Sequence, residues 1–304
     1  MENRQSHLIE RAAARLAEAQ RARPAASPTN LDEAPRGGTA LDMLDPQSSA
    51  VENAITAAGA NGHAFQIDPI CLGKAGLIRE PDSRVAEEFR IVQNRVLRQS
   101  FGGNGAAASG VKNLVMITSA LKGEGKSFVS TNLAGEIARH GDRRVLLVDA
   151  DPKPSGLSRT FGLASARGVI DLARDPALDI ASVVIATASE GLDALPIGQT
   201  DTRSGEVFAS RRMGEVIERI GQRYPNRLVI LDAPPCLSSS IPHALAAVCG
   251  QIVVVVAANS TQQADVEAAL DLLQLCPHVS LLLNKVAPWM NHSFGSYSYL
   301  AAEA

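Results

Sequence analysis

The chain has 304 residues, 45% of them hydrophobic and only 4% aromatic, and its formal net charge is −3. This length suits one α/β domain with additional segments. The small net charge excludes a general electrostatic attraction to nucleic acid or anionic lipid, so we expect no nucleic-acid partner. No apolar run approaches the roughly 20 residues that span a bilayer, and the first residues lack the apolar core of a signal peptide. We therefore expect a cytoplasmic protein that reaches the membrane only through a partner.

The four cysteines do not form a metal-binding pattern. None of them are paired at metal-ligand spacing, and a chain of this length does not need a disulfide framework. We predict reduced thiols at Cys71, Cys236, Cys249 and Cys276.

The first 80 residues are predicted to form an N-terminal helix followed by a linker. Apolar residues recur at helical spacing within residues 4–22, either as a docking helix for a partner or membrane surface or as a solvated helix. From Ala22 to about Gly73, prolines and glycines are scattered among Ala, Ser and Asp with little periodicity. That composition predicts a flexible linker.

Residues 81–290 are predicted to form a single α/β domain. Ser83 is placed to cap a helix with an apolar stripe at Val85, Phe89, Val92 and Val96. Short apolar runs then alternate with helical patterns, which indicates a P-loop type fold with a mainly parallel sheet flanked by helices. The predicted strands are Leu114–Thr118, Val145–Val148, Leu192–Pro196, Leu228–Leu231, Ile252–Val256 and Val279–Leu283, and the main helices are Ser127–His140 (ended by Gly141), Glu206–Gly221 and Thr261–Leu275.

A phosphate-binding loop follows the first long strand. The loop Ala120–Ser127 ends in Gly-Lys-Ser and leads into a helix, as in a Walker A motif, although Ala120 stands where glycine is usual. Glycines allow backbone N–H groups to surround an anion, and the helix N-terminus adds positive potential. Lys126 is expected to reach the β and γ phosphates of ATP, and Ser127 to bind Mg²⁺. The predicted nucleotide-binding residues are Gly123, Glu124, Gly125, Lys126, Ser127 and Phe128.

Three aspartates follow two later strands. Asp149 and Asp151 end the run from Val145, and Asp232 ends the run from Val229. The carboxyl ends of parallel strands share one edge of the sheet, where ligands bind. Carboxylates beside a phosphate loop suit Mg²⁺ coordination and activation of a nucleophile.

Together these motifs resemble the bacterial tyrosine kinases (BY-kinases) of polysaccharide export, which share a fold with septum-positioning and plasmid-partition ATPases. The resemblance covers about residues 80–299. It rests on the Walker A ending Gly123–Ser127, the Asp-x-Asp motif of Val145–Lys153 and the Walker B motif Val229–Pro235. It implies an ATP- and Mg²⁺-dependent tyrosine autokinase that forms homo-oligomers.

The resemblance also assigns roles to single residues. It implies that Lys126 and Ser127 hold phosphate and Mg²⁺, and that Asp149 helps to activate the tyrosine hydroxyl. It assigns Asp151 and Asp232 to Mg²⁺ and its waters. Ser127, Asp151 and Asp232 are thus the expected metal ligands, and Lys126, Asp149, Asp151 and Asp232 the expected catalytic residues.

Some positions are ambiguous or depart from the family pattern. Asn284 resembles the adenine-reading Asn of the superfamily, but it could equally be an ordinary turn residue. Lys153 stands where the family has Arg, so the positive charge is kept but the two parallel hydrogen bonds of a guanidinium are lost. In the family's Glu-x-x-Arg-x-x-Arg oligomer motif, Gln93 replaces the last Arg. A surface pair of Glu87 and Arg90 on a helix would contribute about 0.3 kcal/mol.

The final segment, residues 291–304, carries two of the three tyrosines, Tyr297 and Tyr299. We expect a flexible tail in which both serve as phosphate acceptors, although aromatic residues can also simply pack at a chain end. From Lys285 to Tyr297 an extended chain spans up to about 40 Å, which would reach a neighbouring subunit. Each phosphate would add about −1.5 to −2 charges and disfavour return to an acidic site.

Two other functions compete with the kinase. Positioning and partition ATPases share the motifs but usually carry an early P-loop Lys, and that position is Leu121 here, with Lys122 one residue later. A nucleotide-bound adaptor without turnover is the third possibility. Leu8–Ala12 and Arg84–Arg90 are similar to a subgroup tied to exosortase-type exopolysaccharide loci. This similarity implies control of exopolysaccharide polymerisation or export, with recruitment to the inner face of the membrane by a membrane-bound chain-length regulator.

Overall fold

The computed structural model describes residues 66–78, 80, 83–102, 110–141, 143–153 and 156–286. Within these ranges one eight-stranded sheet has the order β1-β4-β5-β3-β6-β2-β7-β8. Its strands are β1 (Gln66–Ile67), β2 (Val111–Ser119), β3 (Val145–Asp149), β4 (Ile185–Thr187), β5 (Leu192–Leu195), β6 (Leu228–Asp232), β7 (Cys249–Ala257) and β8 (Val279–Asn284). All neighbouring pairs are parallel except the antiparallel pair of β4 and β5.

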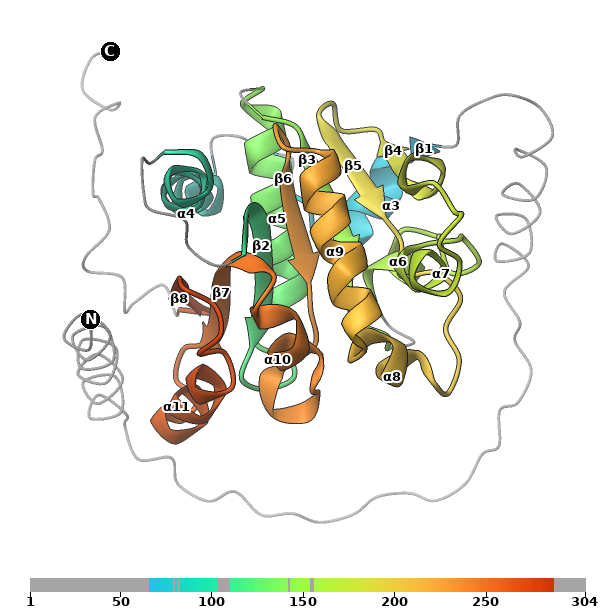
Figure 1. Ribbon diagram of the computed structural model, residues 1–304. Coiled ribbons are helices and arrows are strands. Elements are labelled where there is room, and N and C mark those ends of the chain that lie inside the picture. The colour runs from blue at the N-terminus through green and yellow to red at the C-terminus, as the bar shows by residue number, and fades with distance from the viewer. Residues whose placement is uncertain are drawn as a thin grey trace, which may run out of the picture.

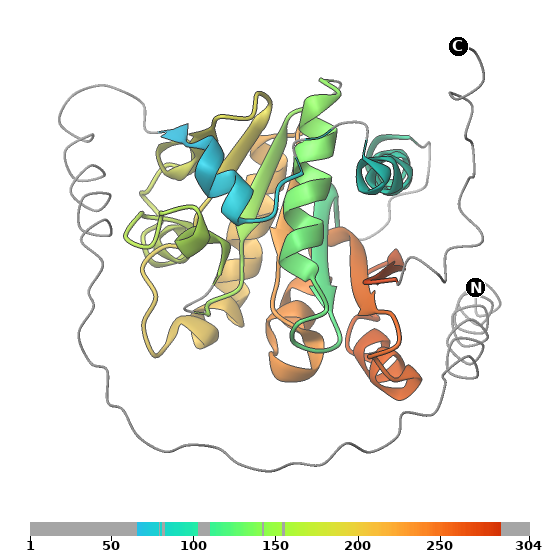
Figure 2. The same cartoon turned by 180° about the vertical axis from the view of Figure 1, so that it is seen from behind.

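Helices cover both faces of the sheet (Figures 1 and 2). One face carries α7 (Val169–Arg174), α8 (Ser204–Phe208), α9 (Arg211–Arg223), α10 (Ile241–Ala246) and α11 (Gln263–Asp271). The other carries α3 (Pro69–Lys74), α4 (Arg84–Phe101), α5 (Lys126–Arg139) and α6 (Leu157–Thr160). Two short 3₁₀ helices, η1 (Ile180–Val183) and η2 (Cys236–Ser238), complete the described elements.

The central strands are buried on both faces, as their continuous apolar sequences predict. In β2, Leu114 and Met116 join the core beneath α9, whereas Val115 and Ile117 join the core beneath α5. All four side chains have no exposed surface. The aliphatic interior expected from the low aromatic content is therefore divided into two layers by one sheet, and the α/β prediction is confirmed.

Each helix predicted within residues 81–290 is present in the structure, although the bounds differ and one predicted helix is divided into two. Ser83 caps α4, accepting a hydrogen bond from the Ala86 N–H, and Gly141 follows α5 with φ +74°. The predicted helix Glu206–Gly221 is two helices, because the chain turns at Ser210, which caps α9. The predicted helix from Thr261 is shorter and begins at Gln263.

Two predictions in the N-terminal part are wrong. Residues 66–74 do not belong to a linker, because β1 pairs with β4 and α3 packs on the sheet. The expected stripe on α4 includes Val85, but that side chain is exposed and Ala86 is buried in its place. Residues 1–65, with the predicted helix at 4–22, lie outside the described residues, as does the tyrosine tail.

The cysteine prediction is confirmed. All four thiols are free, and burial raises the pKa of Cys236 and of Cys276 to about 11. Over the described ranges, no helix is both long and apolar enough to cross a membrane.

Candidate nucleotide and phosphoryl-transfer site

The sheet topology brings the phosphate loop and the three aspartates to one edge. β6 lies between β3 and β2 and is parallel to both, and Asp232 at its end is in register with Ile117 of β2 and Asp149 of β3. The loop that follows β2 begins three residues beyond Ile117, at Ala120. As predicted, the motifs therefore meet at the carboxyl edge of the strands.

The loop itself has the backbone shape of an anion nest. Gly123 and Gly125 adopt φ values of +85° and +97°, a conformation that L side chains rarely adopt. Gly125 occupies the N-cap position of α5 and offers no side-chain cap, so the first N–H groups of the helix face the loop. A Cβ on Gly125 would lie 2.2 Å from Asn284 Nδ2, so this glycine is required sterically as well.

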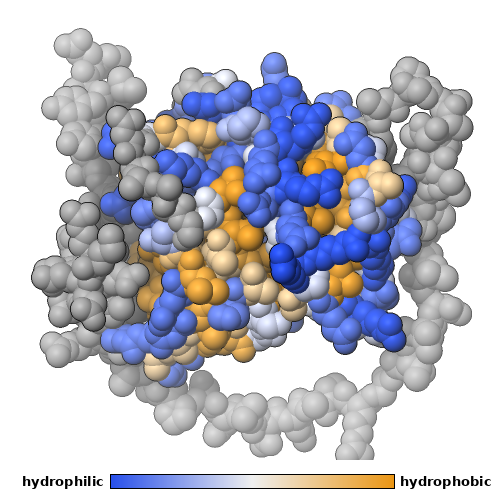
Figure 3. Space-filling view, viewed as in Figure 1, coloured by the Kyte–Doolittle hydropathy of each residue, from blue (hydrophilic) through white to orange (hydrophobic). Residues whose placement is uncertain are grey.

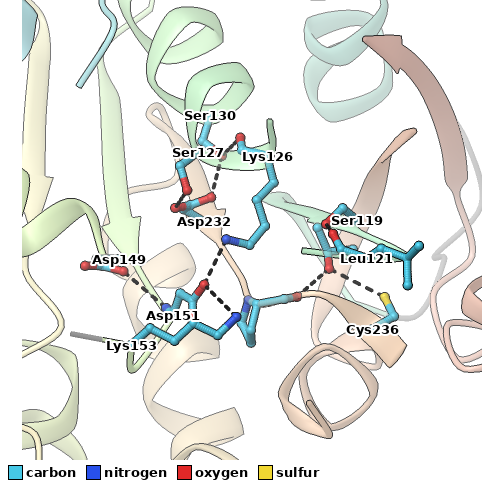
Figure 4. A network of polar contacts seen from close by, with 12 residues as sticks. Ser119, Leu121, Lys126, Ser127, Ser130, Asp149, Asp151, Lys153, Asp232 and Cys236 are labelled. Carbon is cyan, nitrogen blue, oxygen red and sulfur yellow. Dashed lines mark hydrogen bonds and ion pairs between the residues drawn. The ribbon is translucent and has the colours of Figure 1, made fainter. Parts of the chain in front are cut away.

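A polar network joins four of the predicted residues (Figure 4). The Lys126 ammonium lies 2.8 Å from Asp151 Oδ2. The Ser127 hydroxyl donates to Asp232 Oδ2 at 2.7 Å. The Asp232 side chain has no exposed surface, and its second oxygen accepts from the Ser130 hydroxyl at 3.0 Å. Ser130 was not predicted as a site residue, although it lies three residues after Ser127 and therefore shares its helix face.

Asp149 lies beside this network but faces α6. Its Oδ2 accepts from both the backbone N–H and the hydroxyl of Ser158 at 2.7 Å, and its Oδ1 accepts from the Asp151 N–H at 3.1 Å. Ser158 could not be predicted, because an isolated serine nine residues from Asp149 matches no motif. Each carboxylate oxygen has two lone pairs, so Oδ1 retains one free acceptor position.

Burial and the density of carboxylates shift the proton equilibria of the site. Burial raises the pKa of Asp232 to about 7, because Lys126 offsets only part of the desolvation and Asp149 adds to it. Burial also raises the pKa of Asp149, against the hydrogen bonds from Ser158. Burial alone would lower the pKa of Lys126, but the neighbouring carboxylates, Asp232 first, outweigh it and raise that pKa.

The donor set fits a magnesium ion shared with phosphate. Within the described part of the chain, no group of three or more His, Cys, Asp or Glu side chains is arranged to hold a metal alone. Mg²⁺ is usually bound by one or two carboxylates together with substrate phosphates and waters. Asp151 Oδ1 is buried without a hydrogen-bond partner, so it has lone pairs free for such an ion or its waters. The Ser127 hydroxyl and the Asp232 carboxylate would supply the other protein oxygen ligands for the ion.

Glu124 does not point toward the phosphate position. Its carboxylate is buried and accepts from the Leu121 N–H at 2.6 Å, from the Ala257 N–H at 3.3 Å and from the Thr261 hydroxyl. It thus joins the loop to the end of β7 and the start of α11. Thr261 is a further residue that the sequence analysis did not identify.

Three other predicted residues surround the loop. Asn284 donates from Nδ2 to the Glu124 carbonyl at 2.8 Å, and Lys285, which was not predicted, donates to the Gly123 carbonyl at 2.6 Å. Phe128 lies on the α4 side of α5, where its ring centroid is 6.1 Å from that of Phe89. Lys153 lies 3.7 Å from Asp151 Oδ2, so its charge is retained at the site.

The oligomer-motif residues form a network within the chain. Arg90 contacts Glu87 at 2.5 Å, as expected for a surface pair, and also Glu136 of α5 at 3.2 Å. Glu136 is buried and pairs with Arg139 as well, so the expected surface pair is one end of a bridge between α4 and α5. Gln93, which replaces the family's Arg, is buried, and its Oε1 has no hydrogen-bond partner.

Comparison with known proteins agrees with this geometry. Residues 115–292 match the family model described as the CobQ/CobB/MinD/ParA nucleotide binding domain. The chain belongs to this family. Its P-loop, Asp-x-Asp segment and Walker B strand all lie within the matched residues, so the P-loop ATPase fold expected from the motifs is confirmed.

Relatives of this nucleotide-binding domain include named tyrosine kinases. EpsB of Ralstonia nicotianae is 35% identical over 163 residues, which are 53% of this chain and 21% of that protein. The chain thus spans about a fifth of that relative. Tyrosine-protein kinase YwqD of Bacillus subtilis is 28% identical over 65% of this chain and 78% of its own length. The solved kinase domain of the Escherichia coli tyrosine kinase ETK superposes with a TM-score of 0.52 at 25% identity, over 60% of this chain and 71% of that chain.

Proposed function

We propose that this protein is an ATP-dependent protein-tyrosine kinase that phosphorylates Tyr297 or Tyr299 of a second copy of the same chain. Its likeness in both sequence and fold to the kinase domain of ETK carries the proposal. The similarity to YwqD, which extends over most of that kinase, supports it independently.

The phosphate loop would hold the triphosphate through backbone N–H groups of Gly123–Ser127 and the N-terminus of α5. Lys126 would leave Asp151 to contact the β and γ phosphates, since both side chains lie at the mouth of the same loop 2.8 Å apart. Asn284 would recognise the adenine ring, and its hydrogen bond to the Glu124 carbonyl, which holds it against the loop, supports that role.

In the proposed transfer, the tyrosine oxygen forms a bond to the γ-phosphorus while the bond to the β–γ bridging oxygen breaks, leaving ADP. The tyrosine proton would pass to Asp149, whose Oδ1 retains an acceptor position beside the network. Mg²⁺, when bound through Ser127, Asp232 and Asp151, supplies positive charge against the phosphate oxygens. Most of the catalysis would come from positioning and charge neutralisation.

A switch ATPase remains the second candidate, because the matched family includes MinD and ParA proteins. Leu121 opposes it: where those ATPases carry a lysine that reaches across a dimer, this chain has a partly exposed leucine held through its N–H by Glu124. An adaptor that binds nucleotide without turnover is the third candidate. ATP hydrolysis without phosphotyrosine would favour the switch, and binding without hydrolysis would favour the adaptor.

We also propose that the kinase acts at the cytoplasmic face of the membrane as a homo-oligomer, together with a membrane-bound polysaccharide chain-length regulator. Control of exopolysaccharide polymerisation or export would be its output. The resemblance of the motifs supports this part. Full activity of purified protein, with no membrane protein recovered in a pull-down from its source cells, would contradict it.

The kinase itself is tested by incubating the purified chain with Mg-ATP and mapping phosphotyrosine by mass spectrometry. We expect phosphate on Tyr297 or Tyr299, none on a Lys126→Met variant, and none on the tail of a variant in which both tyrosines are phenylalanine. An unmodified tail despite ATP hydrolysis, with and without membranes from the source organism, would refute the proposal.

A further inference from the structure

A basic cleft lies apart from the phosphate loop, between α7 and the first turns of α9. Its volume is about 400 Å³. Figure 3 shows a mainly hydrophilic band over α9 with hydrophobic patches beside it. The lining residues are Leu172, Pro176, Arg211, Arg212, Glu215, Val216 and Arg219. None of them belongs to the proposed catalytic site.

The cleft carries an excess of positive charge. Three arginines face one carboxylate, and Arg211 pairs with that carboxylate, Glu215, at 3.0 Å. Among the described residues, neither Arg212 nor Arg219 forms an ion pair. The first turn of α9 contains no acidic residue, so two arginines lie at the end of the helix where the macrodipole disfavours cations. An anion bound between the arginines would offset their mutual repulsion and also their unfavourable interaction with the helix dipole.

The floor of the cleft is apolar. Leu172 of α7 and Val216 of α9 are buried in the core, and Pro176 forms part of the wall. Arginine binds phosphate through two parallel N–H groups and also stacks on aromatic rings. An apolar floor beneath arginines therefore suits an aromatic ring that carries a phosphate. The volume lies within the range of about 300–1,000 Å³ that is typical of small-ligand sites.

We propose that this cleft binds a phosphotyrosine of the tail, residues 291–304, after the transfer reaction. The inference rests on the proposed function. Each phosphate adds about −1.5 to −2 charges, so the product is repelled by the three aspartates of the catalytic edge and attracted by the arginines. Length permits the contact, because residues 287–297 can extend up to about 36 Å. Helix α7 begins beside the residues that follow β5, which is five strands from β8 and thus about 24 Å across the sheet.

The test measures binding of synthetic, fluorescently labelled peptides of residues 291–304 to the full chain by anisotropy. One peptide carries phosphate on Tyr297 and Tyr299, and the other carries none. We expect the phosphopeptide to bind at least tenfold more tightly, and its affinity to fall at least tenfold in the double variant Arg212→Ala/Arg219→Ala. The matched control is Arg95→Ala/Arg98→Ala, which removes two exposed arginines from α4 on the other face of the sheet.

Several results would overturn the inference. These are equal affinity for both peptides, an unchanged affinity in the cleft variant, or an equal loss in the α4 control. A large loss in Lys126→Met would instead place the peptide at the phosphate loop. Circular dichroism melts show whether each variant is folded. If the alanine double variant does not fold, the Arg212→Lys/Arg219→Lys variant takes its place, and we expect it to retain part of the affinity for the phosphopeptide. Because the phosphopeptide is synthetic, this result is independent of whether the chain has kinase activity.

Discussion

Replacing Glu124 tests whether the phosphate loop is held in shape by the end of the neighbouring strand β7. The carboxylate accepts hydrogen bonds from the N–H groups of Leu121 and Ala257 and from the Thr261 hydroxyl, and it is buried. Glu124→Ala removes all three acceptor contacts. Glu124→Gln keeps the shape: its oxygen can accept from Leu121 while its amide donates to Thr261.

The expected costs follow from these contacts. A hydrogen bond to a charged group contributes about 1.5–3 kcal/mol. The Ala257 N–H also contacts the Thr261 hydroxyl at 3.2 Å, so it retains a partner in the alanine variant. Two effective bonds at the lower end of the range give a loss of about 3 kcal/mol for Glu124→Ala. For Glu124→Gln we expect about 1 kcal/mol, because the charge assistance and the 3.3 Å contact with the Ala257 N–H are lost while the other two hydrogen bonds remain.

Urea denaturation and nucleotide titration measure the two consequences. We expect Glu124→Ala to lower the free energy of unfolding and to weaken ATP binding at least tenfold, with Glu124→Gln intermediate in both. Glu206→Ala, an exposed position on α8, is the matched control and should stay within about 0.5 kcal/mol of the parent. A Glu124→Ala variant that loses stability but binds ATP normally would refute the idea that this carboxylate shapes the loop.

Three further predictions concern substitutions at single positions. Burial raises the pKa of Asp232 from its ordinary value of 3.8 to about 7 in the folded state, so the folded state binds more protons between these limits and stability without nucleotide should fall as pH rises toward 7. The slope of the free energy of unfolding between pH 5 and 7 should be smaller in Asp232→Asn, and an unchanged slope would contradict the assignment. Gly125→Ala should weaken ATP binding at least 100-fold by calorimetry, because φ is +97° and a Cβ would meet Asn284; normal binding would show that the loop can adopt another shape. Gln93→Leu should raise the free energy of unfolding by about 1 kcal/mol in urea, since the buried Oε1 has no partner, whereas destabilisation would reveal a contact for that oxygen.

The fold and most of the sheet edge that carries the candidate site were predictable, because both depend on local patterns. Continuous apolar runs fixed the six long strands, and the order of the motifs placed Lys126, Ser127 and Asp232 at one edge. Strand bounds differ from the prediction by at most three residues at either end. The short strands β1 and β4 were missed, because two or three residues carry no periodicity.

Residue functions that depend on distant contacts could not be predicted. Glu124 was expected to bind nucleotide as part of the loop, yet its side chain turns to Thr261, 137 residues later. Arg90 was expected to form a local pair, yet it also bridges to Glu136 on another helix. Ser158 holds Asp149 without belonging to any motif. Such partners share no sequence spacing, so no pattern in the chain connects them.

The sequence by itself determined the P-loop fold, the glycines of the phosphate loop and the three acidic ends of strands, because backbone conformation and burial impose local rules on residue type. The tertiary structure decided which of these residues touch. It paired Lys126 with Asp151, placed Asp232 under Ser127 and Ser130, and turned Asp149 toward α6. It also brought the arginines of α9 beside Leu172 of α7. The physical reason is that packing elements across the sheet sets the direction and solvation of each side chain, and neither property is encoded in its neighbours along the chain.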